Sequence, residues 1–179
     1  MKRLGVWLCF VSLLPVAAPA ADYGINSGSN EDTVHFRSPA KLEFIEGSTN
    51  NLTGGFTVDP HKTESGVRGL FQVDLRTLKT GIDMRDEHMR ERHLQTDTFP
   101  FAYFSISSVK GLPSELKADS LYSIGGDVEF FIHGVKRSIP ISVEVRRSVE
   151  QNREAIKVTA TFSLKLDDFG IPRPKALFL

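Results

Sequence analysis

Cysteine is almost absent from this chain of 179 residues, because the only one is Cys9 near the N-terminus. One thiol cannot form a disulfide within a single chain, so the fold must be stabilised by its core. An excess of basic residues is also absent, since 22 Lys and Arg residues balance 22 Asp and Glu residues. Proteins that bind nucleic acid need a basic face, so this composition argues against such a partner.

Long apolar runs are absent except at the N-terminus. Lys2 and Arg3 precede an apolar stretch from Leu4 to Val16, and Ala18-Pro19-Ala20 supplies small residues after it. This pattern is typical of a secretory signal peptide over residues 1–20, cut after Ala20, and the run is too short for a membrane span. We expect residues 21–179 to form one domain, in which acidic residues outnumber basic ones by two.

Motifs of catalysis and metal binding are missing as well. The chain has no Gly-x-Ser-x-Gly and no His-Glu-x-x-His sequence. His35, His61 and His133 are scattered, and His88 and His93 are five residues apart, which does not place them on one helical face. We therefore predict no metal site, no catalytic nucleophile and no cofactor.

What the chain does contain is apolar residues at every second position, the pattern of a strand with one buried face. Shorter runs lie at 34–37, 42–47, 55–58, 67–75 and 101–109, after a polar segment at 22–32 that we interpret as irregular. The three longest runs place on their inward faces Tyr122, Ile124, Gly126, Val128, Phe130 and Ile132; Ile139, Ile141, Val143 and Val145; and Ile156, Val158, Ala160, Phe162, Leu164 and Leu166.

Turn signals separate the runs, at Gly134, at 111–120 and at 148–154. About eight strands joined by short turns form an antiparallel meander, which either closes into a barrel or folds into a sandwich. Periodicity does not choose between these two. Either a packed core or the wall of a ligand cavity would explain the inward phenylalanines, and the small inward residues Gly69 and Gly126 would leave space for a ligand.

One segment, "TGIDMRDEHMRERHL" at 80–94, breaks the alternation. Its spacing predicts a short inserted helix near residues 83–94. A charged surface helix would explain most of these residues. We interpret Ile82, Met84 and Met89 as apolar anchors of the helix, so the polar residues between them, Asp83, Arg85, Asp86 and His88, are expected to point partly inward. They could support the polar rim of a cavity, or Asp86 and His88 could act as the acid and base of an enzyme.

Three stretches resemble the YceI-like family. They are "TGIDMRDEHMRERHLQTDTFPFAYFSISSV", which carries an Arg-Asp-x-His motif, "GGDVEFFIHGVKRSIPISVEV", which carries His-Gly-Val, and "FSLKLDDFGIPRP". The resemblance, over about residues 34–174, implies a periplasmic, lipocalin-like antiparallel barrel of about eight strands that holds a polyisoprenoid or similar amphiphile. The chain stops at "PKALFL", where family members run on through one more strand, so either the last strand is missing or it is contributed differently.

The resemblance implies an isoprenoid lipid or isoprenoid quinone as ligand, with the affinity supplied by the interior and with Arg85, Asp86 and His88 supporting the barrel mouth. Transient contact with a membrane is compatible with such a carrier. Two alternatives are a secreted enzyme acting on a lipid-like substrate and a solid-core interaction module. The interior residues predicted to bind the ligand are Phe36, Phe71, Val73, Phe104, Ile106, Val128, Phe130, Ile132, Ile141, Val143, Phe162 and Leu164.

Overall fold

The computed structural model describes residues 20–25, 32–39, 44–107, 109–150 and 153–173. Several predictions lie at least partly outside these residues. They concern the signal peptide up to residue 19, the irregular segment at 26–31, the runs at 42–43 and 108, the turn around 151–152 and the chain end at 174–179.

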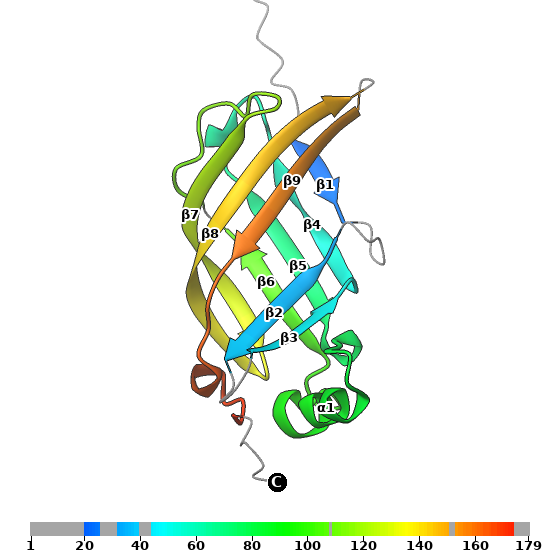
Figure 1. Ribbon diagram of the computed structural model, residues 1–179. Coiled ribbons are helices and arrows are strands. Elements are labelled where there is room, and N and C mark those ends of the chain that lie inside the picture. Colours follow the sequence, from blue (N-terminus) through cyan, green and yellow to red (C-terminus); the bar gives the residue numbers. More distant parts are fainter. Residues whose placement is uncertain (1–19, 26–31, 40–43, 108, 151–152, 174–179) are drawn as a thin grey trace, which may run out of the picture.

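Seven antiparallel strands form one sheet that curls into a nearly closed barrel (Figure 1), which confirms the barrel and excludes the sandwich. The segment at 22–32 was predicted to be irregular, and this is wrong over 22–24, because residues 21–24 form a strand. A four-residue Ala-Asp-Tyr-Gly segment is too short to show alternation and depends on its partner strand. In spatial order the strands are β1 (Ala21–Gly24), β4 (Leu52–Val58), β5 (Arg68–Asp74), β6 (Phe101–Ile106), β7 (Leu121–Ile132), β8 (Val135–Glu150) and β9 (Arg153–Thr161).

A separate two-stranded sheet is formed by β2 (Val34–Pro39) and β3 (Phe44–Thr49), in the lower half of the view in Figure 1. Phe36 of this hairpin packs against the main core. The Ser48 amide donates to the Lys79 carbonyl at 2.9 Å, and the Lys79 amide returns a bond of 3.0 Å. The hairpin therefore covers part of the barrel interior and is tied to the segment that leads into the helix.

β7 and β8 contribute facing buried residues to the core, and the predicted alternation is confirmed in them. Val128 lies opposite Ile139, and both are buried. The strands are joined by His133 and Gly134, whose φ angles of 53° and 75° are both positive. Two positive φ angles suit the right-handed twist of a tight hairpin, and glycine adopts the second without steric conflict.

The third long run was predicted as a strand as far as Leu166, and this is wrong beyond Thr161. The chain instead forms a short 3-10 helix, η4 (Leu166–Phe169), which ends at Gly170 with a φ of 64°. The Ile171 amide donates back to the Leu166 carbonyl at 3.0 Å, and Phe169 and Ile171 are fully buried. Burying these two side chains in the core favours the turn over continued strand.

The predicted helix is confirmed as α1 (Asp83–His88), followed by a π-helical segment, η3 (Met89–Leu94). It lies at the lower end of the barrel in Figure 1. The idea that Ile82 and Met84 anchor it is wrong, since both are exposed. Met84 lies two positions before Asp86 and so on the opposite side of the helix, while Met89 packs against the core.

Two further 3-10 turns complete the described fold, η1 (Thr63–Ser65) in the β4–β5 connection and η2 (Leu75–Thr77) after β5. A helix long and apolar enough to cross a bilayer does not occur in the part of the chain that the structure describes.

Candidate functional site: an aromatic interior with a lateral opening

Phenylalanine rings from four parts of the chain meet inside the barrel. Phe104 of β6 lies with its ring centroid 6.2 Å from Phe71, 6.5 Å from Phe130 and 5.8 Å from Phe162. Phe130 lies 5.4 Å from Phe162 and 5.7 Å from Phe169. These distances are typical of favourable edge-to-face and offset-stacked pairs, so the rings form one continuous apolar surface.

The twelve residues predicted to bind a ligand all lie in or beside this core, but at different depths. Phe71 is half-buried against Phe104, and Phe162 is exposed. The others are either fully buried, namely Val128, Phe130, Ile132, Ile141 and Val143, or partly buried against the core, namely Phe36, Val73, Phe104, Ile106 and Leu164. Side chains that are already enclosed offer a ligand little surface, so the half-buried and exposed residues are the stronger candidates.

Gly69 does not provide the space expected of it. A Cβ atom there would lie 2.9 Å from Cβ of Phe56 and 3.0 Å from the Gly55 carbonyl oxygen. The room beside Gly69 is therefore filled by the neighbouring strand, and the glycine serves close packing.

Apolar side chains that face the interior are exposed to solvent along β9 and just after it. Val145 of β8 and Val158 of β9 are directly opposite each other, which places their side chains on the same inward face. Val145 is only 6% exposed, whereas Val158 is 42% exposed and Phe162 is 37% exposed. The difference arises because β9 is an edge strand of the sheet. Apolar surface on the inner side of β9 is thus accessible to solvent.

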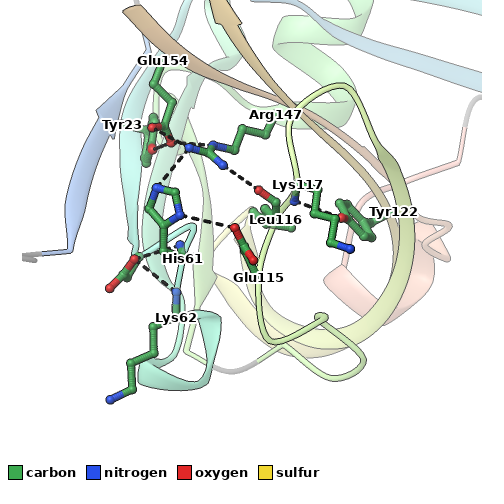
Figure 2. Close-up of polar contacts among 10 residues, drawn as sticks. Tyr23, His61, Lys62, Glu115, Leu116, Lys117, Tyr122, Arg147 and Glu154 are labelled. Carbon is green, nitrogen blue, oxygen red and sulfur yellow. Dashed lines mark hydrogen bonds and ion pairs between the residues drawn. The ribbon is translucent and has the colours of Figure 1, made fainter. Parts of the chain in front are cut away.

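The upper end of the barrel carries a polar group of residues that the sequence did not predict (Figure 2). We call Tyr23, His61, Glu115, Arg147 and Glu154 the upper cluster. The guanidinium of Arg147 donates to the Leu116 carbonyl at 2.9 Å, to His61 Nε2 at 3.1 Å and to Glu154 Oε2 at 3.2 Å. His61 Nδ1 lies 3.5 Å from Glu115 Oε1.

Arg147 continues the inward series of Ile139, Ile141, Val143 and Val145 on β8, and it is buried. Its Nε atom is buried without a hydrogen bond to any described residue, although it lies 3.1 Å from Glu154 Oε1 as an ion pair. A signal was present in the sequence, because a charged residue falls at an inward position of a long strand. Such a residue requires charged or hydrogen-bonding partners, and these come from distant segments.

Charge compensation at the upper cluster shifts two pKa values. Burial raises the pKa of Tyr23 well above its usual range, and the hydrogen bond to Glu154 adds to this. Burial also acts to raise the pKa of Glu154, but hydrogen bonds from Tyr23 and Arg147 and the Arg147 charge outweigh it and hold that pKa below its usual range. Glu154 is therefore a carboxylate, and Tyr23 is its neutral donor.

At the lower end, the structure joins two of the three predicted polar residues through Thr80. Asp86 is buried and accepts two hydrogen bonds from Thr80, while Arg85 donates to Thr80 Oγ1 at 2.8 Å. Burial acts to raise the pKa of Asp86, but the Thr80 hydrogen bonds and the charges of Arg90 and Arg85 hold it below its usual range. This arrangement braces the start of α1.

His88, which lies within the described residues, is half-buried and is not hydrogen-bonded to Asp86. Asp86 is hydrogen-bonded to Thr80 instead, so the structure does not assemble the acid–base pair considered from the sequence. Across the described ranges, no three His, Asp or Glu side chains gather in a way that could hold a metal ion.

Thr80 also borders a polar depression of about 640 Å³ between the β2–β3 hairpin and the segment before α1. Phe36, Arg37, Glu46 and Lys79 are among its lining residues. A second depression, of about 600 Å³, lies over β1, β4, β5 and β6 and includes Tyr23, Phe56 and Leu70. Both are open surface features, distinct from the ring cluster around Phe104.

A family model described as the YceI-like domain matches residues 23–177 of the chain. A UPF0312 protein of Vibrio vulnificus (strain YJ016) is 28% identical over 168 residues, which cover 92% of this chain and 85% of the relative. A UPF0312 protein of Pseudomonas putida (strain W619) is 30% identical over 165 residues, which cover 89% of this chain and 81% of the relative.

Solved structures share the fold at low sequence identity. A polyisoprenoid binding domain from Saccharophagus degradans, implicated in plant cell wall breakdown, aligns with a TM-score of 0.59 and 18% identity, over 78% of this chain and 75% of that domain. The YCEI protein of Campylobacter jejuni aligns with a TM-score of 0.62 and 14% identity over 75% of each chain. BcnA of Burkholderia cenocepacia aligns with a TM-score of 0.59 and 15% identity, over 79% of this chain and 82% of BcnA.

The resemblance drawn from the Arg-Asp-x-His and His-Gly-Val motifs is confirmed by these matches. The solved neighbours share the barrel fold with this chain. Because the family model matches far more than half of the chain, the chain belongs to the YceI-like family.

Proposed function

We propose that this protein is a periplasmic carrier that holds a long-chain isoprenoid lipid, or a similar amphiphile such as an isoprenoid quinone, against the aromatic interior of its barrel. The observation that supports this most directly is Phe162. Its ring lies within the cluster formed by Phe104 and Phe130, yet it remains 37% exposed beside the edge strand. An apolar ring that is inside the barrel and also accessible is suited to an apolar ligand.

The physical chemistry of an isoprenoid tail fits this surface. Each buried CH₂ group contributes about 0.8 kcal/mol, so a few isoprene units would bind usefully without any polar contact. Ordering the flexible tail offsets part of that gain. Specificity is then expected to depend on the length of the apolar surface more than on any single polar group.

The predicted export supports a carrier role in the periplasm. The first residues have the composition of a signal peptide, and the chain after Ala20 has no cysteine to be oxidised there. The solved neighbour from Saccharophagus degradans is described as polyisoprenoid-binding, which favours the same ligand class for this chain.

The test is to express the full chain in a Gram-negative bacterium, purify it from the periplasmic fraction and identify bound lipid by native mass spectrometry. We expect an isoprenoid lipid at close to one molecule per protein. Phe162→Glu should lose the lipid, whereas Leu70→Glu, which alters an exposed apolar residue outside the ring cluster, should retain it. Folded protein that is free of lipid, or equal lipid in both variants, would contradict the proposal.

A further inference from the structure

The two ends of the barrel wall are β1 and β9, and the described residues of these strands share no backbone ladder. A side-chain hydrogen bond connects them: the Tyr23 hydroxyl donates to Glu154 Oε1 at 2.6 Å (Figure 2). Every neighbouring pair within the wall is held by a ladder of backbone bonds, so this is the place where the wall separates with the least disruption.

The bond is firmly held on the β1 side. Tyr23 lies opposite Phe56 of β4, and the two rings stack with centroids 5.2 Å apart and an interplanar angle of 15°. Four residue pairs connect β1 to β4. The packed ring of Tyr23 therefore holds its hydroxyl group at the inner side of the edge strand β1.

The bond is equally well held on the β9 side. Glu154 is paired with Arg147, whose guanidinium is fixed by the Leu116 carbonyl and His61. The amide of the residue after Leu116, Lys117, donates to the hydroxyl of Tyr122 at 3.0 Å, which ties this loop to β7. Both partners of the Tyr23–Glu154 bond are thus pre-positioned by their own elements.

Val158 follows Glu154 on the same edge strand, and Phe162 comes directly after the end of that strand at Thr161; both apolar side chains are exposed. A ligand that reaches the ring cluster through this side must pass the free edge of β9. Opening at the upper end requires the Tyr23–Glu154 bond to break while the ladders on either side remain intact.

We propose that the Tyr23–Glu154 hydrogen bond is a latch on a lateral passage, and that it sets the rate at which the ligand of the proposed carrier function enters and leaves. This inference rests on that function. Since the latch is closed both before and after binding, it raises the barrier in both directions. Weakening it should speed association and dissociation by the same factor and leave the dissociation constant unchanged, which a purely structural contact would not do.

The first experiment follows binding of all-trans-retinol, an uncharged fluorescent isoprenoid, by stopped-flow fluorescence. Tyr23→Phe keeps the stacked ring and removes only the hydroxyl. Both rate constants should rise about three- to tenfold, the factor expected from the net strength of one hydrogen bond. The matched control is Glu129→Gln, which removes the exposed 2.8 Å ion pair with Lys136 on the outer wall and should change neither rate.

The second experiment locks the passage without altering the latch residues. Asp22→Cys with Ala155→Cys, cross-linked by a bis-maleimide, joins the residues next to Tyr23 and Glu154 in a chain that has no other cysteine after Cys9. Both rates should fall about tenfold or more. The control cross-link, Ser123→Cys with Glu144→Cys, joins directly opposed residues of β7 and β8 and should have no effect.

The outcomes are distinguishable. Retinol binding with equal rates in the locked and unlocked proteins would overturn the latch and leave the carrier function standing. A change confined to dissociation, with a matching loss of affinity, would also overturn it. Failure of the wild-type protein to bind retinol or any longer isoprenoid alcohol would overturn both proposals.

Discussion

The Thr80 amide and the Thr80 hydroxyl both donate to one oxygen of Asp86, Oδ1, at 2.7 and 2.5 Å. The Arg85 guanidinium approaches Thr80 from its other side and donates to the Thr80 carbonyl at 3.1 Å. Two charged residues in the helix are therefore used to hold one turn in front of it. These contacts of Arg85 and Asp86 with Thr80 explain part of the high density of charged residues at 80–94.

Asp86→Ala is expected to lower the free energy of unfolding by about 1–3 kcal/mol, because it leaves two donors of Thr80 without their acceptor in a buried place. Urea unfolding would measure the loss. Glu87→Ala, at the exposed neighbouring position, is the control and should change stability by less than about 0.5 kcal/mol. Equal effects of the two substitutions would show that the brace contributes nothing.

Truncating two contacting rings should separate stability from ligand binding. Phe130→Ala removes a buried ring and should cost about 3–5 kcal/mol of stability. Phe162→Ala removes an exposed ring of the same cluster and should cost clearly less, while it weakens retinol binding at least as strongly. Thermal unfolding and fluorescence titration of both variants would test this. Phe162→Ala with unchanged affinity would exclude this ring from the ligand site.

Acidification should weaken the upper cluster through Glu154. Its pKa in the folded protein lies below its usual value of 4.5, so the unfolded chain binds a proton first. The stabilising contribution is therefore complete above about pH 4.5 and is lost as the pH falls through the lower folded pKa. Unfolding free energies measured between about pH 7 and pH 3 should fall more steeply for the wild type than for Glu154→Gln. Parallel curves would contradict this prediction.

Removal of metal ions should have no effect. The histidine spacing predicts no ligand set, and the described residues contain no cluster of three potential ligands. Dialysis against EDTA is expected to leave both the Tm and retinol binding unchanged. Loss of either, restored by zinc or iron, would reveal a site that sequence and structure have not indicated.

Export should remove the first twenty residues. The small residues Ala18 and Ala20 follow the apolar run at the positions that a signal peptidase reads. N-terminal sequencing of protein from the periplasmic fraction is expected to begin at Ala21. Protein that keeps its first residues, or remains in the cytoplasm, would show the signal-peptide interpretation to be wrong.

The parts of the fold that could be predicted are those determined by short-range sequence patterns. The alternation in β7 and β8 runs long enough to identify the buried side of each strand, and Gly134 marks the turn between them. The choice of a barrel did not come from periodicity. It came from the family motifs, because strand pattern alone does not report how a sheet closes.

What could not be predicted depends on contacts between distant segments. Tyr23 and Glu154 are 131 positions apart, and no local pattern links them. The four residues of β1 gain their structure from pairing with β4, and Leu166 leaves the strand because Phe169 and Ile171 find buried positions. The orientation of α1 was misjudged because apolar Met84 was assumed to face inward, whereas Asp86 occupies that side.

The short connection at His133 and Gly134 has a consequence for how the chain acquires its structure. β7 and β8 are adjacent in sequence and share twelve residue pairs, from Leu121↔Arg146 to Ile132↔Val135. They can therefore pair progressively from the turn, at little cost in loop-closure entropy. β1 must instead find β4 across an intervening segment that contains β2 and β3, with only four pairs to gain. We expect the β7–β8 hairpin to be the nucleus of folding and β1 to dock last, which leaves the edge that carries Tyr23 as the final part of the wall to become ordered.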